Sequence, residues 1–285
     1  MSDAEPRLAE PRVTQPEDSR REGRIWLTYP ELCSPGLVHG IVVFEEFDSG
    51  VPYDRWTGVA ADFLIRHLLV PPTAKRPAPE PVPDPGQASG VAILLPRQVH
   101  GNVIRTTDAD SAYPDPNTLV CDGLATNRAD IMIGISVADC IPLLTADIAN
   151  RVIGVAHCGW KGIASGIVEE LVASLRKLGG DPRTTRCLIG PGIGRCCYEV
   201  RDDLLREFPS DEVSRFSQAR RGTTFFDLKQ VVAARLAGEG VDPSRISIDK
   251  TCTSCQKYAG KRALPSYRRD GNRCGRIVAV LALSG

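Results

Sequence analysis

The clearest pattern in the chain is SVADCIPLLTADIANRVIGVAHCGWKGIASGIVEELV, residues 136–172. Two apolar runs, CIPLLTA and RVIGVAH, are separated by the four residues DIAN, 147–150, which is a common length for a hairpin loop. Apolar residues then recur at helical spacing from Ile163 to Leu178, and Gly179 follows as a stop signal. The stretch therefore predicts a β-hairpin that leads into an amphipathic helix.

The predicted hairpin brings a thiol and an imidazole together. If the loop is centred on residues 147–150, Cys140 and His157 form a directly opposed cross-strand pair, with Cβ atoms about 4.5–5.5 Å apart. His157 also lies at a strand-to-helix corner, where α/β sheets expose their chemistry. In RQVHGNVI, His100 stands at the end of a further predicted strand, so it is a candidate third member of the group.

These three residues admit three interpretations. A catalytic zinc site uses three protein ligands and keeps one position open, and Cys and His are typical zinc ligands. Alternatively, Cys140 is a nucleophile and His157 its base. The third interpretation is a buried thiol beside a structural histidine. We favour the metal, because a catalytic dyad needs only one histidine and the chain places His100 at a matching strand end.

The rest of the chain predicts one catalytic domain over residues 24–285, of the α/β class, with α+β as the alternative. Residues 1–23 are polar and predict a disordered tail. Residues 71–90 contain seven prolines and predict an exposed insert. Helical spacing predicts a helix within residues 55–70 and another that begins after Asp227, a plausible N-cap. Strands are predicted for TTRCLIG, SRISID and GRIVAVLALS.

Composition excludes several functional classes. The 285 residues contain 35 Lys and Arg against 35 Asp and Glu, so neither nucleic acid nor an anionic membrane is an expected partner. The chain has no run of 18 apolar residues and no apolar signal-peptide core at its start, which predicts a cytoplasmic protein without a membrane span. Its ten cysteines are expected to be thiols or metal ligands. We expect a monomer or a small homo-oligomer.

Six motifs, in order, carry a resemblance to a known family: QVHG, DGLAT, SVADCIPLL, GVAHCGWKG, GPGIGRCCYEV and SYRRDGNRCGR. Between about Val91 and Ala282 the chain resembles the laccase-domain family, once called multicopper polyphenol oxidases. The family is now described as zinc-dependent purine nucleoside phosphorylases, and some members are called peptidoglycan-editing factors. Four histidines in the whole chain are too few for several copper ions, so a multicopper oxidase is rejected.

The resemblance implies a single α/β domain with mixed β-sheets flanked by helices, similar to the catalytic fold of certain cytotoxic deamidating toxins. It implies Zn²⁺ as cofactor, held by His100, Cys140 and His157. It also implies phosphorolysis of adenosine, inosine, guanosine and methylthioadenosine, with deamination of adenosine as a further activity. Residues 43–63 lack the glycine-rich and Ser-Leu-Asn motifs that family members carry near the nucleoside and the phosphate.

Three further features complete the candidate site. Within the family pattern, the paired guanidinium groups of Arg268 and Arg269 are candidates for binding substrate phosphate. Asp139 precedes Cys140 and would point to the other face of a strand, so it is a candidate either for orienting a metal ligand through a hydrogen bond or for capping a turn. Cys252 and Cys255 form a CxxC pair, and with the scattered thiols elsewhere they are interpreted as reduced structural cysteines rather than a second zinc site.

The sequence therefore predicts a zinc-dependent enzyme that binds a purine nucleoside and phosphate. The alternative is a cysteine-type amide or peptide hydrolase that edits cell-wall precursors with Cys140 and His157. The nucleobase-deaminase signature of H-x-E with P-C-x-x-C is absent from the chain.

Overall fold

A computed structural model describes residues 12–14, 17–21, 24–46, 91–108, 110–112, 114–115, 118–258, 261–262 and 264–284. The helix predicted within residues 55–70 and the insert at 71–90 lie outside these residues. In the described part, strands form a seven-stranded, a six-stranded, a three-stranded and a two-stranded sheet. This mixed α/β architecture confirms the predicted fold class.

The seven-stranded sheet has the order β1 (Arg12–Thr14), β15 (Ile246–Asp249), β11 (Arg186–Ile189), β9 (Ile141–Asp147), β10 (Val152–Cys158), β7 (Gly123–Thr126) and β6 (Ile104–Thr107). The six-stranded sheet has the order β2 (Glu17–Arg21), β3 (Arg24–Thr28), β4 (Leu37–Glu46), β18 (Cys274–Leu283), β8 (Ile131–Val137) and β5 (Ala92–Leu94).

The smaller sheets pair β12 (Glu199–Val200), β14 (Thr223–Phe226) and β13 (Ser217–Arg220), and β16 (Lys257–Tyr258) with β17 (Lys261–Arg262). The helices are α2 (Trp160–Ala164), α3 (Ile167–Lys177), α4 (Asp202–Leu205), α5 (Ser210–Phe216), α6 (Leu228–Gly238) and α7 (Tyr267–Asp270), with 3-10 turns η1 (Pro30–Leu32), η3 (Pro243–Arg245) and η4 (Gly271–Arg273).

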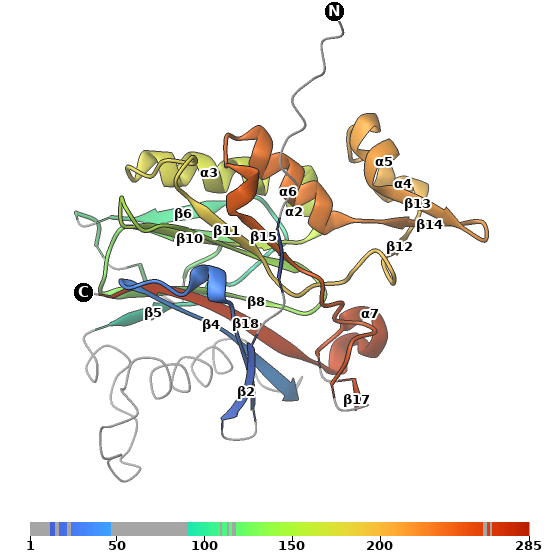
Figure 1. The fold of residues 1–285 in the computed structure, drawn as a ribbon, viewed down its shortest axis with the longest axis horizontal. Helices are drawn as coiled ribbons and strands as arrows, with labels where there is room; N and C mark the ends of the chain where they lie inside the picture. The colour runs from blue at the N-terminus through green and yellow to red at the C-terminus, as the bar shows by residue number, and fades with distance from the viewer. Residues whose placement is uncertain are drawn as a thin grey trace, which may run out of the picture.

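The two large sheets and the helices form three layers, with the seven-stranded sheet in the middle (Figure 1). Helices α3 and α6 cover one face of this sheet, where Leu171 and Val231 pack with Leu143 of β9. The six-stranded sheet covers the other face, where Leu144 packs with strands of both sheets. The alternation of Leu143 and Leu144 between two apolar layers explains why β9 is buried along its whole length.

The hairpin register differs from the prediction. Asp147 pairs with Val152, so the turn comprises residues 148–151 and His157 lies opposite Pro142. The cause is the Asp147 carboxylate, which is buried and accepts a 2.7 Å hydrogen bond from the Asn150 side chain. Asp147 therefore ends strand β9 instead of starting the loop. Cys140, just before β9, is diagonal to His157; a partner shift of two residues keeps both side chains on one face.

Two other expectations need correction. The helical run from Ile163 to Leu178 is broken into α2 and α3, because Gly166 adopts a left-handed backbone with φ of 91°. The prediction of a disordered tail at 1–23 is wrong for β1 and β2, which pair with β15 and β3. Strand pairing at a sheet edge uses backbone hydrogen bonds, so the polar composition did not reveal it.

Several local predictions are confirmed. The Asp227 side chain accepts a hydrogen bond from the Gln230 backbone and caps α6. Gly179 follows the end of α3 with φ of 93°. The predicted strands of TTRCLIG, SRISID and GRIVAVLALS correspond to β11, β15 and β18.

Gly123 tests how tightly β7 and β10 approach each other. A Cβ atom at Gly123 would lie 2.6 Å from the Val155 carbonyl oxygen, so we expect Gly123→Ala to lower the free energy of unfolding by about 1–3 kcal/mol. The matched control is Gly238→Ala in α6, where no atom lies within 4 Å of the added methyl and stability should rise by up to about 1 kcal/mol. Urea unfolding of both variants measures the difference; equal stabilities would contradict the close approach.

Candidate functional site

The Asp122 carboxylate connects the parts of the site. Asp122 lies just before β7 and is fully buried. Its Oδ1 atom lies 2.9 Å from Nδ1 of His157 and accepts a 2.8 Å hydrogen bond from the His100 backbone N–H. Its Oδ2 atom accepts a 2.8 Å hydrogen bond from the Gly101 N–H. One carboxylate thus orients the ring of His157 and fixes the loop that carries His100.

His100 sits in a backbone conformation that the surrounding loop imposes. Its φ is 60°, a left-handed value that is uncommon outside glycine. The Gln98 side chain holds the start of this loop through hydrogen bonds to the Ser136 backbone N–H and carbonyl oxygen, both 2.8 Å. Gly162 of α2 lets the loop approach from the other side, because a Cβ atom there would lie 2.6 Å from the Gly101 carbonyl oxygen.

The structure brings His100, Cys140 and His157 together, with one potential ligand atom from each lying within 4.8 Å of the others. The two imidazole rings meet edge to face, with centroids 4.7 Å apart. Gly159 leaves the space between them open, because a Cβ atom there would lie 3.2 Å from the Cys140 sulfur and 3.3 Å from the His100 ring. Three soft or borderline ligands around an open position suit a divalent metal such as zinc.

The ionisation of the site also suits a metal. Burial alone would raise the pKa of the Cys140 thiol, but the charge of His157 and hydrogen bonds from both histidines lower this pKa to about 6. Burial would lower the pKa of His157, but the Cys140 thiolate and the Asp122 carboxylate raise it to about 9. Without a metal, the pair is thus a thiolate and an imidazolium at neutral pH. The sulfur is already in the form that binds a metal.

The Asp139 side chain contacts the segment of Thr253, Ser266 and Arg268 and not the candidate metal ligands. Its carboxylate accepts hydrogen bonds from the Thr253 hydroxyl at 2.5 Å, the Ser266 hydroxyl at 3.1 Å and the Arg268 backbone N–H at 2.6 Å. Asp139 therefore holds the segment that carries Arg268, whereas Asp122 holds the candidate metal ligands. The sequence analysis included Asp122 only as part of the DGLAT motif; an aspartate at the start of a buried strand was the available signal.

The two candidate arginines point to different places. Arg268 lines the cavity beside Cys140, and its guanidinium lies 5.3 Å from the centre of the Tyr198 ring. Arg269 instead donates hydrogen bonds to the carbonyl oxygens of Thr253, Ser254 and Leu264 at 2.8–3.0 Å. Arg268 therefore faces the cavity, and Arg269 is part of the loop framework.

The candidate ligands open into a cavity of about 860 Å³, large enough for a small-molecule substrate. The sequence analysis missed most of its walls, which include the side chains of Arg97, Gln98, Trp160, Tyr198, Tyr267 and Arg276. Aromatic rings and guanidinium groups suit a ligand that has a flat apolar part and an anionic part. These residues come from five separate segments, so spacing along the chain gave no signal.

Residues 86–284 match the family model described as multi-copper polyphenol oxidoreductase laccase. The chain belongs to this family. Among relatives of the family, a Deinococcus radiodurans protein named purine nucleoside phosphorylase is 34% identical over 186 residues, which cover 65% of this chain and 68% of that protein. Purine nucleoside phosphorylase YlmD of Geobacillus stearothermophilus is 32% identical over 194 residues, covering 65% and 69%.

Solved structures agree with the family assignment at the level of the fold. The crystal structure of YlmD from Geobacillus stearothermophilus superposes with a TM-score of 0.72 at 24% identity, covering 93% of this chain and 98% of the other. Bacillus licheniformis YfiH, titled a hypothetical protein, gives a TM-score of 0.69 at 24% identity, covering 87% and 93%. In the part of this chain that the structure describes, no helix is both long enough and apolar enough to span a membrane.

The pKa shifts predict how Cys140 reacts in metal-free protein. Because its thiolate persists down to about pH 6, the iodoacetamide alkylation rate should rise with pH and reach half its plateau near that value, against about 8.5 for free cysteine. Asp122→Asn removes a charge that raises the His157 pKa, so the midpoint should move to higher pH. Mass spectrometry of the Cys140 peptide measures both rates. A midpoint near 8.5 in the unsubstituted protein would contradict the ion pair.

Proposed function

We propose that this chain is a purine nucleoside phosphorylase that holds one zinc ion with His100, Cys140 and His157. The observation that carries the proposal is the convergence of these three side chains on one wall of an 860 Å³ cavity. The names of the relatives support the reaction class. The Asp122–His157 hydrogen bond supports the metal, since a ligating histidine commonly donates its other ring N–H to a carboxylate.

The reaction transfers a ribosyl group to phosphate. A phosphate oxygen forms a bond to C1′ of the nucleoside as the bond from C1′ to the base nitrogen breaks; the electron pair leaves with the base, which takes up a proton. When bound, zinc would be held by His100, Cys140 and His157 and would supply Lewis-acid chemistry. Proposed substrates are adenosine, inosine, guanosine and methylthioadenosine. Deamination of adenosine is a proposed side activity, in which a water oxygen forms a bond to C6 of the purine, the bond from C6 to the amino nitrogen breaks, and ammonia leaves.

Different residues of the cavity wall bind the purine and the phosphate in this proposal. In this proposal Trp160 and Tyr198, which line the cavity, pack against the flat purine, and Arg268 binds phosphate. The stacking of Arg268 on Tyr198 and its 3.0 Å hydrogen bond to the Glu199 carbonyl oxygen fix the guanidinium in place. A guanidinium has five N–H donors, so this anchoring still leaves donors for an anion. Asp139 positions the same residue through the Arg268 backbone.

One observation favours a second function, a cysteine-type amide or peptide hydrolase. The thiolate of Cys140, the imidazolium of His157 and the carboxylate of Asp122 form the chain of groups that activates a cysteine nucleophile. We favour the metal because the arrangement also brings His100 within 4.8 Å of the other two groups, and the nucleophile mechanism does not use it. We propose a cytoplasmic enzyme.

Zinc content and activity separate the two functions. Cys140→Ser and His100→Ala should both lose one zinc ion per chain and nucleoside phosphorolysis, because each removes a ligand of that ion. Asp122→Asn should weaken zinc binding by about 10–100-fold. The matched control is Cys158→Ala, which removes a buried thiol next to His157 and should retain both. Elemental analysis and chromatography of adenosine, adenine, inosine and hypoxanthine measure the outcome. Full nucleoside turnover by chelated protein or by His100→Ala would refute the metal-dependent proposal. Amide or peptide hydrolysis by the same samples would support the hydrolase.

Arg268→Ala tests the phosphate site. Losing a charged hydrogen-bond donor should raise the KM for phosphate by roughly 10–100-fold, with a smaller change in the KM for nucleoside. Arg183→Ala is the control, because Arg183 is 84% exposed and pairs with Asp181 outside the cavity. Steady-state kinetics, with phosphate and nucleoside varied separately, measures the two KM values. An unchanged KM for phosphate would place the phosphate elsewhere.

A further inference from the structure

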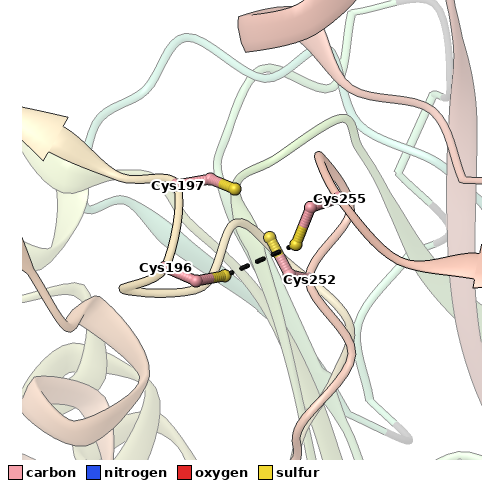
Figure 2. Close-up of side chains that lie close together, drawn as sticks. All are labelled: Cys196, Cys197, Cys252 and Cys255. Atoms are coloured by element: carbon pink, nitrogen blue, oxygen red, sulfur yellow. Dashed lines mark hydrogen bonds between the residues drawn. The ribbon is translucent and has the colours of Figure 1, made fainter.

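A second group of potential metal ligands lies outside the three-residue site. Cys196 and Cys197 are in the loop between β11 and β12, and Cys252 and Cys255 follow β15. The four sulfur atoms all lie within 4.8 Å of one another. The Cys196 and Cys255 sulfurs are 3.6 Å apart, and the four side chains point toward a common centre (Figure 2). This group, the four-cysteine cluster, has no part in the proposed reaction.

The fold brings the two loops together independently of the sulfur atoms. Gly192 and Cys252 form a parallel β-bridge, and the Thr253 N–H donates a 3.2 Å hydrogen bond to the Gly192 carbonyl oxygen. Gly194 permits the close approach, because a Cβ atom there would lie 3.3 Å from both the Cys196 sulfur and the Cys252 Cβ. The convergence of the thiols is therefore part of a defined backbone arrangement.

We propose that the four-cysteine cluster binds one structural zinc ion. With Zn–S bonds of about 2.3 Å, tetrahedral geometry requires sulfur atoms about 3.8 Å apart. The observed separation of 3.6 Å for one pair, and the limit of 4.8 Å for all pairs, require only small side-chain movements to reach it. Four cysteine ligands fill the tetrahedron, so this site is closed, whereas the three-ligand site keeps an open position.

A backbone N–H group and a buried positive charge lie next to the cluster. The Gly194 N–H points at the Cys252 sulfur from 3.3 Å. The buried Lys229 ammonium, whose positive charge interacts with Cys252 and Cys196, donates hydrogen bonds to the Asp249 and Thr251 carbonyl oxygens at 2.6 and 2.8 Å. A positive charge and N–H donors partly offset the excess negative charge of a zinc ion with four thiolates.

The proposed ion would fasten one wall of the cavity. Tyr198 directly follows Cys197 and supports Arg268. Thr253, between the two CxxC cysteines, donates its hydroxyl to Asp139, and Asp139 also accepts the Ile193 N–H through its carbonyl oxygen at 2.8 Å. Both loops of the cluster therefore contact the residue next to Cys140. The ion would hold Tyr198 and Arg268 at a fixed distance from the candidate catalytic metal.

X-ray absorption at the zinc edge tests the cluster without interference from the other site. The sample is the full-length double variant His100→Ala/Cys140→Ser, purified under reducing conditions, in which two of the three other ligands are absent. We expect one zinc per chain, coordinated by four sulfur atoms at about 2.3 Å. A metal-free double variant, or zinc bound mainly by nitrogen and oxygen, would overturn the proposal. Iron with four sulfur ligands would overturn the choice of zinc.

Substitutions and alkylation provide the second measurement. Cys255→Ser in the otherwise unchanged chain should lose one zinc relative to Cys33→Ser, the control, since Cys33 is an exposed cysteine outside the cluster. If Cys255→Ser fails to fold, alkylation of the unsubstituted protein tests the cluster instead. Its four cluster thiols should resist iodoacetamide until a chelator is added. Rapid alkylation of zinc-replete protein, or a Cys196–Cys255 disulfide in freshly reduced and repurified protein, would refute the cluster as a zinc site. These results do not depend on nucleoside turnover.

Discussion

The hydrogen bonds of the Asp122 carboxylate are the interactions on which the site depends. Asp122 lies where β7 begins, between β6 and β10, and is fully buried. A buried carboxylate is stable only when its charge is compensated, and here the compensation comes from His157 and from backbone N–H groups of residues 99–101. The same contacts that satisfy Asp122 therefore place both histidines. Close packing of β7 against β10 at Gly123 keeps the carboxylate in position.

The charges of Asp122, His157 and Cys140 are compatible with two chemical roles for Cys140, a nucleophile and a metal ligand. Asp122 stabilises a positive charge on His157, and His157 in turn stabilises the Cys140 thiolate. A thiolate with a histidine and a carboxylate is the basis of a cysteine nucleophile. The thiolate and the histidine, once the histidine has lost a proton, can also bind a metal. The proposed metal site uses one further residue, His100. Its left-handed backbone brings a second imidazole to the same opening, a strained feature that the nucleophile would not require.

A second set of contacts links the candidate catalytic centre to the cavity wall. Cys140 and Asp139 are adjacent, yet their side chains serve different structures: Cys140 joins the histidines, and Asp139 binds Thr253, Ser266 and the backbone of Arg268. The left-handed backbone of Asp139, with φ of 78°, separates the two directions. One turn of the chain thereby connects the candidate metal ligands to Arg268, which lines the cavity, and to the loops of the four-cysteine cluster.

The sequence by itself determined the α/β class, the β9–β10 hairpin, the caps at Asp227 and Gly179, and the three candidate ligands, because periodicity, turn residues and strand ends are local properties. Even the wrong hairpin register placed Cys140 and His157 on one face, since strand faces repeat every two residues. Only the tertiary structure decided the role of Asp122, the separate directions of Arg268 and Arg269, and the meeting of Cys196 and Cys197 with Cys252 and Cys255. Those outcomes depend on contacts between segments far apart in the chain, here 35 residues for Asp122 and His157 and 59 for Cys196 and Cys255. No spacing rule encodes such contacts, because sheet order and loop packing create them.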